Sequence, residues 1–284
     1  MEELTRLRSR IDSISELLSI VHTMRALSAV RMRQANESLA GARKYAEVIG
    51  TAFAEALSLV DTEGPLLRPR RRDGRGLLVF SSEHGFVGAL NEVLIDHAST
   101  ALDGGQLFIV GTRGARVASE RGIDVSWALP MTTRRDGIPV VARKIAAEIY
   151  RRFERREIFR LDVMFARTRG AGNWTIEQQP LLPPDPKAFP ASRPDIPALH
   201  YLPAPQLFER VVEEYFFAEL THAAMEALAG EYTARVATMG AAHDNIERKL
   251  DELRHREAQL RQEDITTELI DVITGSEALL HPRP

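Results

Sequence analysis

The chain has 284 residues, of which 44% are hydrophobic, and its formal net charge at pH 7 is −3. A negative net charge argues against a dedicated nucleic-acid-binding protein, which needs a basic face to neutralise phosphates. The chain contains no cysteine, which excludes disulfides, thiolate zinc sites and cysteine nucleophiles. No apolar run approaches the ~20 residues needed to cross a bilayer, and residues 1–10 lack the apolar core of a signal peptide. We therefore expect a cytosolic globular protein.

Residues 1–59 are predicted to form one long helix. The segment contains no proline, and its only glycines are Gly41 and Gly50. Its apolar residues recur at steps of three and four, the spacing of a narrow coiled-coil seam. The seam consists of Leu4, Leu7, Ile11, Ile14, Leu18 and Val21, and it then shifts to Met24, Leu27 and Val30. At 1.5 Å per residue this helix would be about 85 Å long.

Residues 206–279 are predicted to form a second long helix, again without proline. Its seam includes Val212, Tyr215, Phe216, Leu220, Met239, Ala242, Ile246, Leu250, Leu253 and Leu260. Helices of this length cannot be buried in a small globule and must pair with each other or with partners. Because one helix opens the chain and the other closes it, an antiparallel coiled coil between the two is the expected arrangement.

Residues 76–179, between these helices, are predicted to form a central α/β domain. Short apolar runs at 76–80, 107–110 and 161–166 are typical of buried strands, and 88–102, 113–122 and 137–156 are expected helices. Strands that alternate with helices indicate a mostly parallel sheet covered on both faces. Residues 175–179 are expected to add an antiparallel edge. The nine prolines in 180–205 indicate an extended connector outside any central strand.

Nucleotide and metal sites find little support in the sequence. None of the four lysines follows a glycine, so the chain lacks the Gly-Lys-Ser/Thr loop that cradles phosphate. Gly170-Ala171-Gly172 looks like the start of a dinucleotide fingerprint, but it opens no helix and is interpreted as a hairpin turn. The eight histidines are dispersed, and no two have the spacing of metal ligands. We expect no catalytic residue, no metal and no cofactor.

Two polar segments have both a functional and a plain structural interpretation. Ser81-Ser82-Glu83-His84-Gly85 places a hydroxyl, a carboxylate and an imidazole at a strand end, where ligands bind in open α/β sheets. The favoured interpretation is a polar turn that caps the following helix. The arginines near Pro69 form a basic cluster that suits either a solvated loop or contact with lipid headgroups. Its members are Arg68, Arg70, Arg71, Arg72 and Arg75.

Three stretches resemble the gamma subunit of rotary ATP synthases. The first lies within 10–35, where Ile20-Val21-His22-Thr23-Met24 is similar to the family's Ile-Thr-Lys-Ala-Met. The second, Ser82-Glu83-His84-Gly85-Phe86-Val87-Gly88-Ala89-Leu90-Asn91, is similar to Ser-Asp-Arg-Gly-Leu-Cys-Gly-Gly-Phe-Asn. The third runs from Ala234 to Glu268 and is similar to the family's closing helix. Together they span nearly the whole chain.

The chain departs from the family pattern at three positions. His22 replaces the lysine of the first motif, Val87 the cysteine of the central motif, and Ala89 its paired glycine. These departures favour a divergent member, such as the sodium-pumping form of the enzyme.

The resemblance implies a non-catalytic central rotor stalk that couples rotation of a membrane ring to ATP synthesis or hydrolysis in a catalytic head. It implies the alpha and beta subunits of the head, the epsilon subunit and the membrane rotor ring as partners. It also implies a peripheral membrane position on the cytoplasmic face of the bacterial inner membrane. By the same resemblance, the residues that touch the surrounding ring or its apolar sleeve are Met24, Arg235, Arg261, Gln262, Thr266, Glu268, Val272 and Ile273.

Two functions from other classes remain open at this point. A coiled-coil scaffold that recruits partners would be stable as its own oligomer. An α/β enzyme with helical dimerisation arms would bind a small molecule at the strand ends near Ser81 and Gly111.

Overall fold

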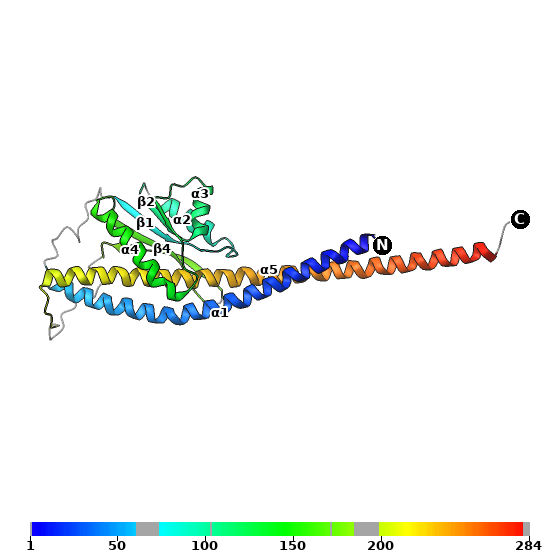
Figure 1. The fold of residues 1–284 in the computed structure, drawn as a ribbon, viewed down its shortest axis with the longest axis horizontal. Coiled ribbons are helices and arrows are strands. Elements are labelled where there is room, and N and C mark those ends of the chain that lie inside the picture. The colour runs from blue at the N-terminus through cyan, green and yellow to red at the C-terminus, as the bar shows by residue number, and fades with distance from the viewer. Residues whose placement is uncertain (1, 61–73, 103, 171, 185–198, 281–284) are drawn as a thin grey trace. The chain divides into compact units, whose positions relative to one another are not determined.

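Two long helices dominate the computed structural model, which describes residues 2–60, 74–102, 104–170, 172–184 and 199–280, with side chains as far as Ile273. Helix α1 spans Glu2–Ser58 and helix α5 spans Ala204–Leu280 (Figure 1). At 1.5 Å per residue they are about 86 and about 115 Å long. Pro205 is the second residue of α5, where a missing backbone N–H costs nothing because the first turn has no acceptor for it.

The chain divides into two compact units. The terminal unit consists of Met1–Leu27 and Met239–Pro284, and the central unit is Ser28–Thr238. In the terminal unit, α1 and α5 pair antiparallel: Arg8 Nε donates to Glu257 Oε1 at 2.9 Å, and the His22 and His243 rings lie 6.1 Å apart. Val21, Met239, Leu250 and Leu253 are buried along this pair. These four residues all belong to the apolar seam expected from the sequence.

The central unit contains a five-stranded sheet in the order β3-β2-β1-β4-β5. Its strands are β1 (Arg75–Phe80), β2 (Gln106–Val110), β3 (Trp127–Leu129), β4 (Arg160–Thr168) and β5 (Trp174–Leu182). The pairs β1–β2, β1–β4 and β2–β3 are parallel, and β4–β5 is antiparallel. The mostly parallel sheet and its antiparallel edge were both expected from the sequence and are confirmed.

Alternate side chains of β1 point into two different apolar cores. Leu77 and Val79 pack against α2 (Leu90–Ala101) and α3 (Thr112–Glu120). Leu78 and Phe80 pack on the opposite face, against α4 (Ile138–Glu154) and the central-unit parts of α1 and α5. Because both faces of the central strands are buried, these strands read as continuous apolar runs in the sequence.

Two features of the sheet differ from the expectation. Strand β3 was missed because it has only three residues, Trp127–Leu129, and these are partly buried or exposed, so they are too few to show a strand pattern. Strand β5 continues to Leu182, three residues into the segment expected to be a connector, and therefore contains Pro180. Proline is tolerated there because β5 pairs with β4 alone among the described strands, so a ladder donor is missing only on an edge strand. Of the basic cluster, Arg75 is the exposed first residue of β1, and the other four arginines lie outside the described residues.

Candidate functional site

The polar turn after β1 is held by its own chain. Ser81 Oγ donates to the carbonyl oxygens of Val110 (3.1 Å) and Gly111 (3.2 Å). Ser82 Oγ donates to the His84 carbonyl at 2.8 Å, and Ser82 N donates to Asn91 Oδ1 at 3.1 Å. These hydroxyls are engaged by neighbouring strands and turns, so this turn does not present a free serine nucleophile.

Glu83 caps a helix, but not the one that follows it. Its carboxylate accepts from Thr112 N (3.1 Å) and Thr112 Oγ1 (2.7 Å) at the start of α3, and from Met131 N (2.7 Å). Helix α2, which follows the turn in sequence, has no side-chain cap at Ala89. The expectation that the turn caps the next helix is therefore wrong. A carboxylate beside the first turn of α3 satisfies a backbone N–H that has no partner within its own helix and is favoured by the helix dipole.

The turn is also tied to α5 through a buried ion pair. Arg235 is 6% exposed, and its guanidinium donates to Glu231 at 2.6 Å and to the carbonyls of Gly85 (3.2 Å) and His84 (3.3 Å). Glu231 is also buried and accepts from Glu83 N at 3.3 Å. Burial raises the pKa of the Glu231 carboxyl, against the opposing effect of Arg235. Arg235 thus holds the strand-end turn against α5.

The other sequence-predicted contact residues lie in the terminal unit. Met24 is half-buried on α1, whereas the α5 residues are exposed. Those exposed residues are Arg261, Gln262, Thr266, Glu268, Val272 (66% exposed) and Ile273 (58%). Within α5, Arg261 donates to Glu257 at 2.6 Å, and Thr266 Oγ1 donates to the Gln262 carbonyl at 2.8 Å. One helix therefore presents six of the eight predicted residues to solvent.

Three apolar residues of the same stretch were not selected from the sequence. Ile265 (52% exposed), Leu269 (58%) and Ile270 (57%) are exposed among the predicted contact residues. Ile265, Leu269 and Val272 follow one another at steps of four and three, which places them on one helical face. That spacing is visible in the sequence and could have marked them. An exposed apolar face of this kind is typical of a surface that a partner covers.

A buried charge cluster joins α1, α5 and β4 inside the central unit. Glu226 is fully buried, and its Oε1 lies 2.5 Å from an Arg43 nitrogen, 3.3 Å from Arg167 Nε and 3.5 Å from His222 Nε2. Burial alone would raise the pKa of Glu226, but His222 and the two arginines outweigh it and lower that pKa. For His222, burial opposes the charged form, yet Glu219 and Glu226 raise its pKa to about 9. The ion pairs of this cluster link α1, α5 and β4, which are distant from one another in the sequence.

In the described part of the central unit, a pocket of about 500 Å³ lies away from the strand ends near Ser81 and Gly111. It is lined by residues of α2, β4 and β5: Asp96, His97, Thr100, Ala101, Met164, Ile176 and Gln178. Gly111 packs directly against Ser81, and a Cβ added at this glycine would collide with the Ser81 backbone. Gly170 and Gly172 lie at positive φ in the turn between β4 and β5, which confirms the hairpin interpretation. Among the described residues, no helix has the length and hydropathy that a membrane span requires.

Comparisons with known proteins agree across nearly the whole chain. A protein-family model described as "ATP synthase" matches residues 3–279. The ATP synthase gamma chain of Bdellovibrio bacteriovorus is 26% identical, over 98% of this chain and 99% of the relative. The ATP synthase gamma chain of Trichormus variabilis is 28% identical, over 98% of this chain and 100% of the relative.

Solved structures share the fold at lower sequence identity. A chain of the Euglena gracilis mitochondrial ATP synthase, in a structure of its OSCP, F1 and c-ring, superposes with a TM-score of 0.66 at 15% identity. That match covers 98% of this chain and 95% of the other. A chain from the central stalk and c-ring of the Tetrahymena thermophila enzyme gives a TM-score of 0.59 at 17% identity, covering 78% and 99%.

Proposed function

We propose, since the chain belongs to the ATP synthase family, that it is the gamma subunit of a rotary ATP synthase and transmits torque without catalysing a reaction. The observation that carries this proposal is the form of α5. This helix has 77 residues, and its described side chains from Ile265 to Ile273 leave large apolar groups exposed. A helix of this kind needs a partner along its length.

The proposed mechanism follows from stiffness and asymmetry. Two paired helices with a continuous apolar seam resist bending, which a shaft requires. A shaft with different side chains around its circumference can favour a different conformation in each surrounding subunit as it turns. In this proposal the surrounding alpha and beta subunits carry out the chemistry of ATP, and this chain biases their conformations.

We assign the contact with the alpha and beta subunits to the exposed residues of the terminal unit. Arg261, Gln262, Thr266 and Glu268 supply polar groups, while Val272 and Ile273 supply an apolar tip that fits a hydrophobic sleeve. Met24, which is half-buried on α1, is a further proposed contact residue. Arg235 takes a different part: its buried guanidinium positions the turn at 83–85, and its contribution to coupling acts through that turn.

The remaining parts of the proposal concern the other segments and the location. Residues 1–59 and 206–279 serve as the shaft, residues 76–179 form the domain that meets the epsilon subunit and the membrane rotor ring, and residues 180–205 connect that domain to the closing helix. The chain is a peripheral subunit of a membrane-associated complex, and we place it on the cytoplasmic face of the bacterial inner membrane.

Direct observation of rotation tests the function. The chain has no cysteine, so Ser99→Cys on the exposed side of α2 provides one unique thiol for attaching a bead. The labelled chain is assembled with the alpha and beta subunits of its own organism, and the head is fixed to a surface. We expect the bead to turn in one direction with Mg-ATP and to stop with Mg-ADP. A head that hydrolyses ATP around a stationary bead, or a chain that does not join the head, would refute the proposal.

A further inference from the structure

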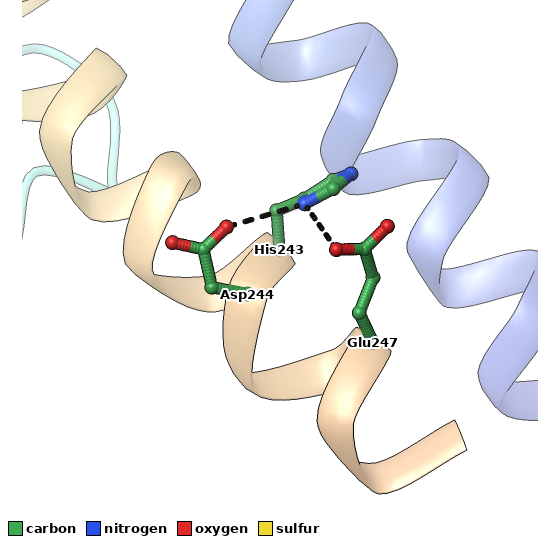
Figure 2. A group of neighbouring side chains, drawn as sticks. All are labelled: His243, Asp244 and Glu247. Atoms are coloured by element: carbon green, nitrogen blue, oxygen red, sulfur yellow. Dashed lines mark ion pairs between the residues drawn. The ribbon is translucent and has the colours of Figure 1, made fainter. Parts of the chain in front are cut away.

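His243 of α5 is surrounded by potential metal ligands that the stalk function does not use. Figure 2 shows its ring between the carboxylates of Asp244 and Glu247. Its Nδ1 lies 3.4 Å from Asp244 Oδ1 and 3.5 Å from Glu247 Oε2. That nitrogen is inaccessible to solvent and makes no hydrogen bond, although the whole side chain is 17% exposed. A buried polar atom without a hydrogen bond is costly, so it favours a further partner at this position.

The geometry suits one shared cation. The donor atoms of His243, Asp244 and Glu247 all lie within 4.8 Å of one another. His243 and Glu247 are four residues apart on a helix, which places both on the same face. A second imidazole, that of His22, comes from α1 with its ring centre 6.1 Å from that of His243. Both histidines belong to the terminal unit, so the ring-to-ring distance lies within one compact body.

The chemistry of these donors selects the class of ion. Two imidazoles and two carboxylates match the nitrogen and oxygen ligands of a four-coordinate Zn²⁺, with bonds of about 2.0–2.2 Å. Mg²⁺ and Ca²⁺ prefer oxygen ligands alone and would make no use of the rings. The two carboxylates carry a formal charge of −2, which matches a divalent cation. Arg25 lies beside Gly240, one helical turn before His243, but it is exposed to solvent and its charge is screened there.

We propose that His22, His243, Asp244 and Glu247 bind a zinc-like divalent transition-metal ion, which links α1 to α5 in the terminal unit. The ion takes the place of a missing hydrogen bond at His243 Nδ1. Because His22 comes from α1 and the other three ligands come from α5, bound metal opposes separation of the two helices and raises the thermal stability of the terminal unit. This inference does not depend on the stalk function.

Calorimetric titration of the full chain with ZnCl₂, after EDTA treatment and removal of the chelator, tests the site. We expect one zinc ion per chain. In His243→Ala and in Glu247→Gln, the affinity for zinc should fall at least about tenfold relative to the unmodified chain. His22→Ala should weaken binding and abolish the rise in melting temperature that zinc causes. His255→Ala, which removes an exposed histidine from the same helix, is the matched control and should bind as the unmodified chain does. MgCl₂ should give no saturable heat.

Three outcomes would overturn the proposal or its central feature. Absence of saturable zinc binding to the unmodified chain would mean that a proton or water satisfies Nδ1. Unchanged affinity in His243→Ala would place any zinc elsewhere. Loss of binding in His243→Ala but not in His22→Ala would refute the link between helices. Should His243→Ala unfold by circular dichroism, His243→Asn provides the same test with a polar side chain.

Discussion

Arg261 and Gln262 occupy the exposed surface of α5 that we assign to the head subunits. A guanidinium has five donors, and Arg261 already uses one nitrogen toward Glu257. The combined change Arg261→Ala and Gln262→Ala should leave folding and assembly intact, because exposed substitutions shift stability by only about 0.5 kcal/mol. It should lower rotation-coupled ATPase activity several-fold. The measurements are ATPase rate and ion pumping in the assembled complex, with thermal melting of the free chain.

Glu263 and Thr267 supply the matched control for this pair. Both are exposed neighbours, and Thr267 Oγ1 donates to the Glu263 carbonyl at 2.9 Å, as Thr266 does to Gln262. The double variant Glu263→Ala with Thr267→Ala should reduce rotation-coupled ATPase activity less than the double variant of Arg261 and Gln262 does. Equal activity in both double variants and in the unmodified complex would refute the contact assignment while leaving the family membership untouched.

His222 makes the stability of the central unit depend on pH. Its folded-state pKa of about 9 lies above the ordinary value of 6.5, so the stabilisation is fully present below about pH 6.5 and is lost as the pH rises through about 9. A shift of this size corresponds to at most about 3 kcal/mol. The free energy of unfolding, measured in urea from pH 6 to 10, should fall over this window in the unmodified chain. In His222→Gln the fall should be smaller.

His255→Gln is the control for that titration, because it removes a histidine from an exposed position of the same helix. It should keep the pH dependence of the unmodified chain. If His222→Gln kept the same slope between pH 7 and 10, the carboxylates around His222 would not be holding its proton.

At the scale of elements, α5 approaches the sheet so closely that one position must be glycine. A Cβ added at Gly230 would collide with the backbone carbonyl of Ala166 in β4. Backbone cannot yield as a flexible side chain does, so Gly230→Ala should destabilise the chain by about 1–3 kcal/mol despite the higher helix propensity of alanine. Urea unfolding measures the change.

Gly240 gives the matched comparison, because it is another glycine inside the same helix. A Cβ there would lie 3.8 Å from the guanidinium atoms of Arg25, which is an ordinary contact distance. Gly240→Ala should be neutral or stabilise the chain by up to about 1 kcal/mol. Equal changes in the free energy of unfolding for the two variants would show that α5 does not pack against β4 at Gly230.

The elements that the sequence predicted well are those with a strong local pattern. The strand at 76–80 and the helix at 137–156 appear as β1 and α4 with ends shifted by only one or two residues. Strand β3 has only three residues, too few for a recognisable strand pattern, and it is defined by its pairing with β2. Pro180 argued for a connector, but its position beside Asp162 at a sheet edge permits a strand. The local propensity of a segment cannot show whether it forms an edge strand or a central strand of a sheet.

For the whole molecule, we expect the isolated chain to neither bind Mg-ATP tightly nor hydrolyse it. The sequence lacks a Gly-Lys phosphate loop, and the hydroxyls of Ser81 and Ser82 at the strand ends already donate to protein carbonyls. Calorimetric titration of the pure chain with Mg-ATP should give no saturable heat at micromolar concentrations. Micromolar binding would contradict a purely mechanical role. An assay of released phosphate supplies the second readout.

The sequence by itself determined the two long helices, the alternation of strands and helices between them, and the motifs that resemble the gamma family. Each of these depends on residues that are close together in the chain: steps of three and four along a helix, or an apolar run of four or five residues along a strand. Exposed apolar positions such as Ile265 and Leu269 follow the same spacing, which is why they too could have been predicted.

Only the tertiary structure decided which distant side chains meet. It buried Arg235 beside Glu231, turned Glu83 toward α3, and brought His22 within reach of His243. The dispersal of the histidines in sequence therefore said nothing about their separation in space. The physical reason is that such contacts depend on the register of two paired helices and on the packing of helices against a sheet. Both are set by the summed burial of many side chains, and no short motif specifies them.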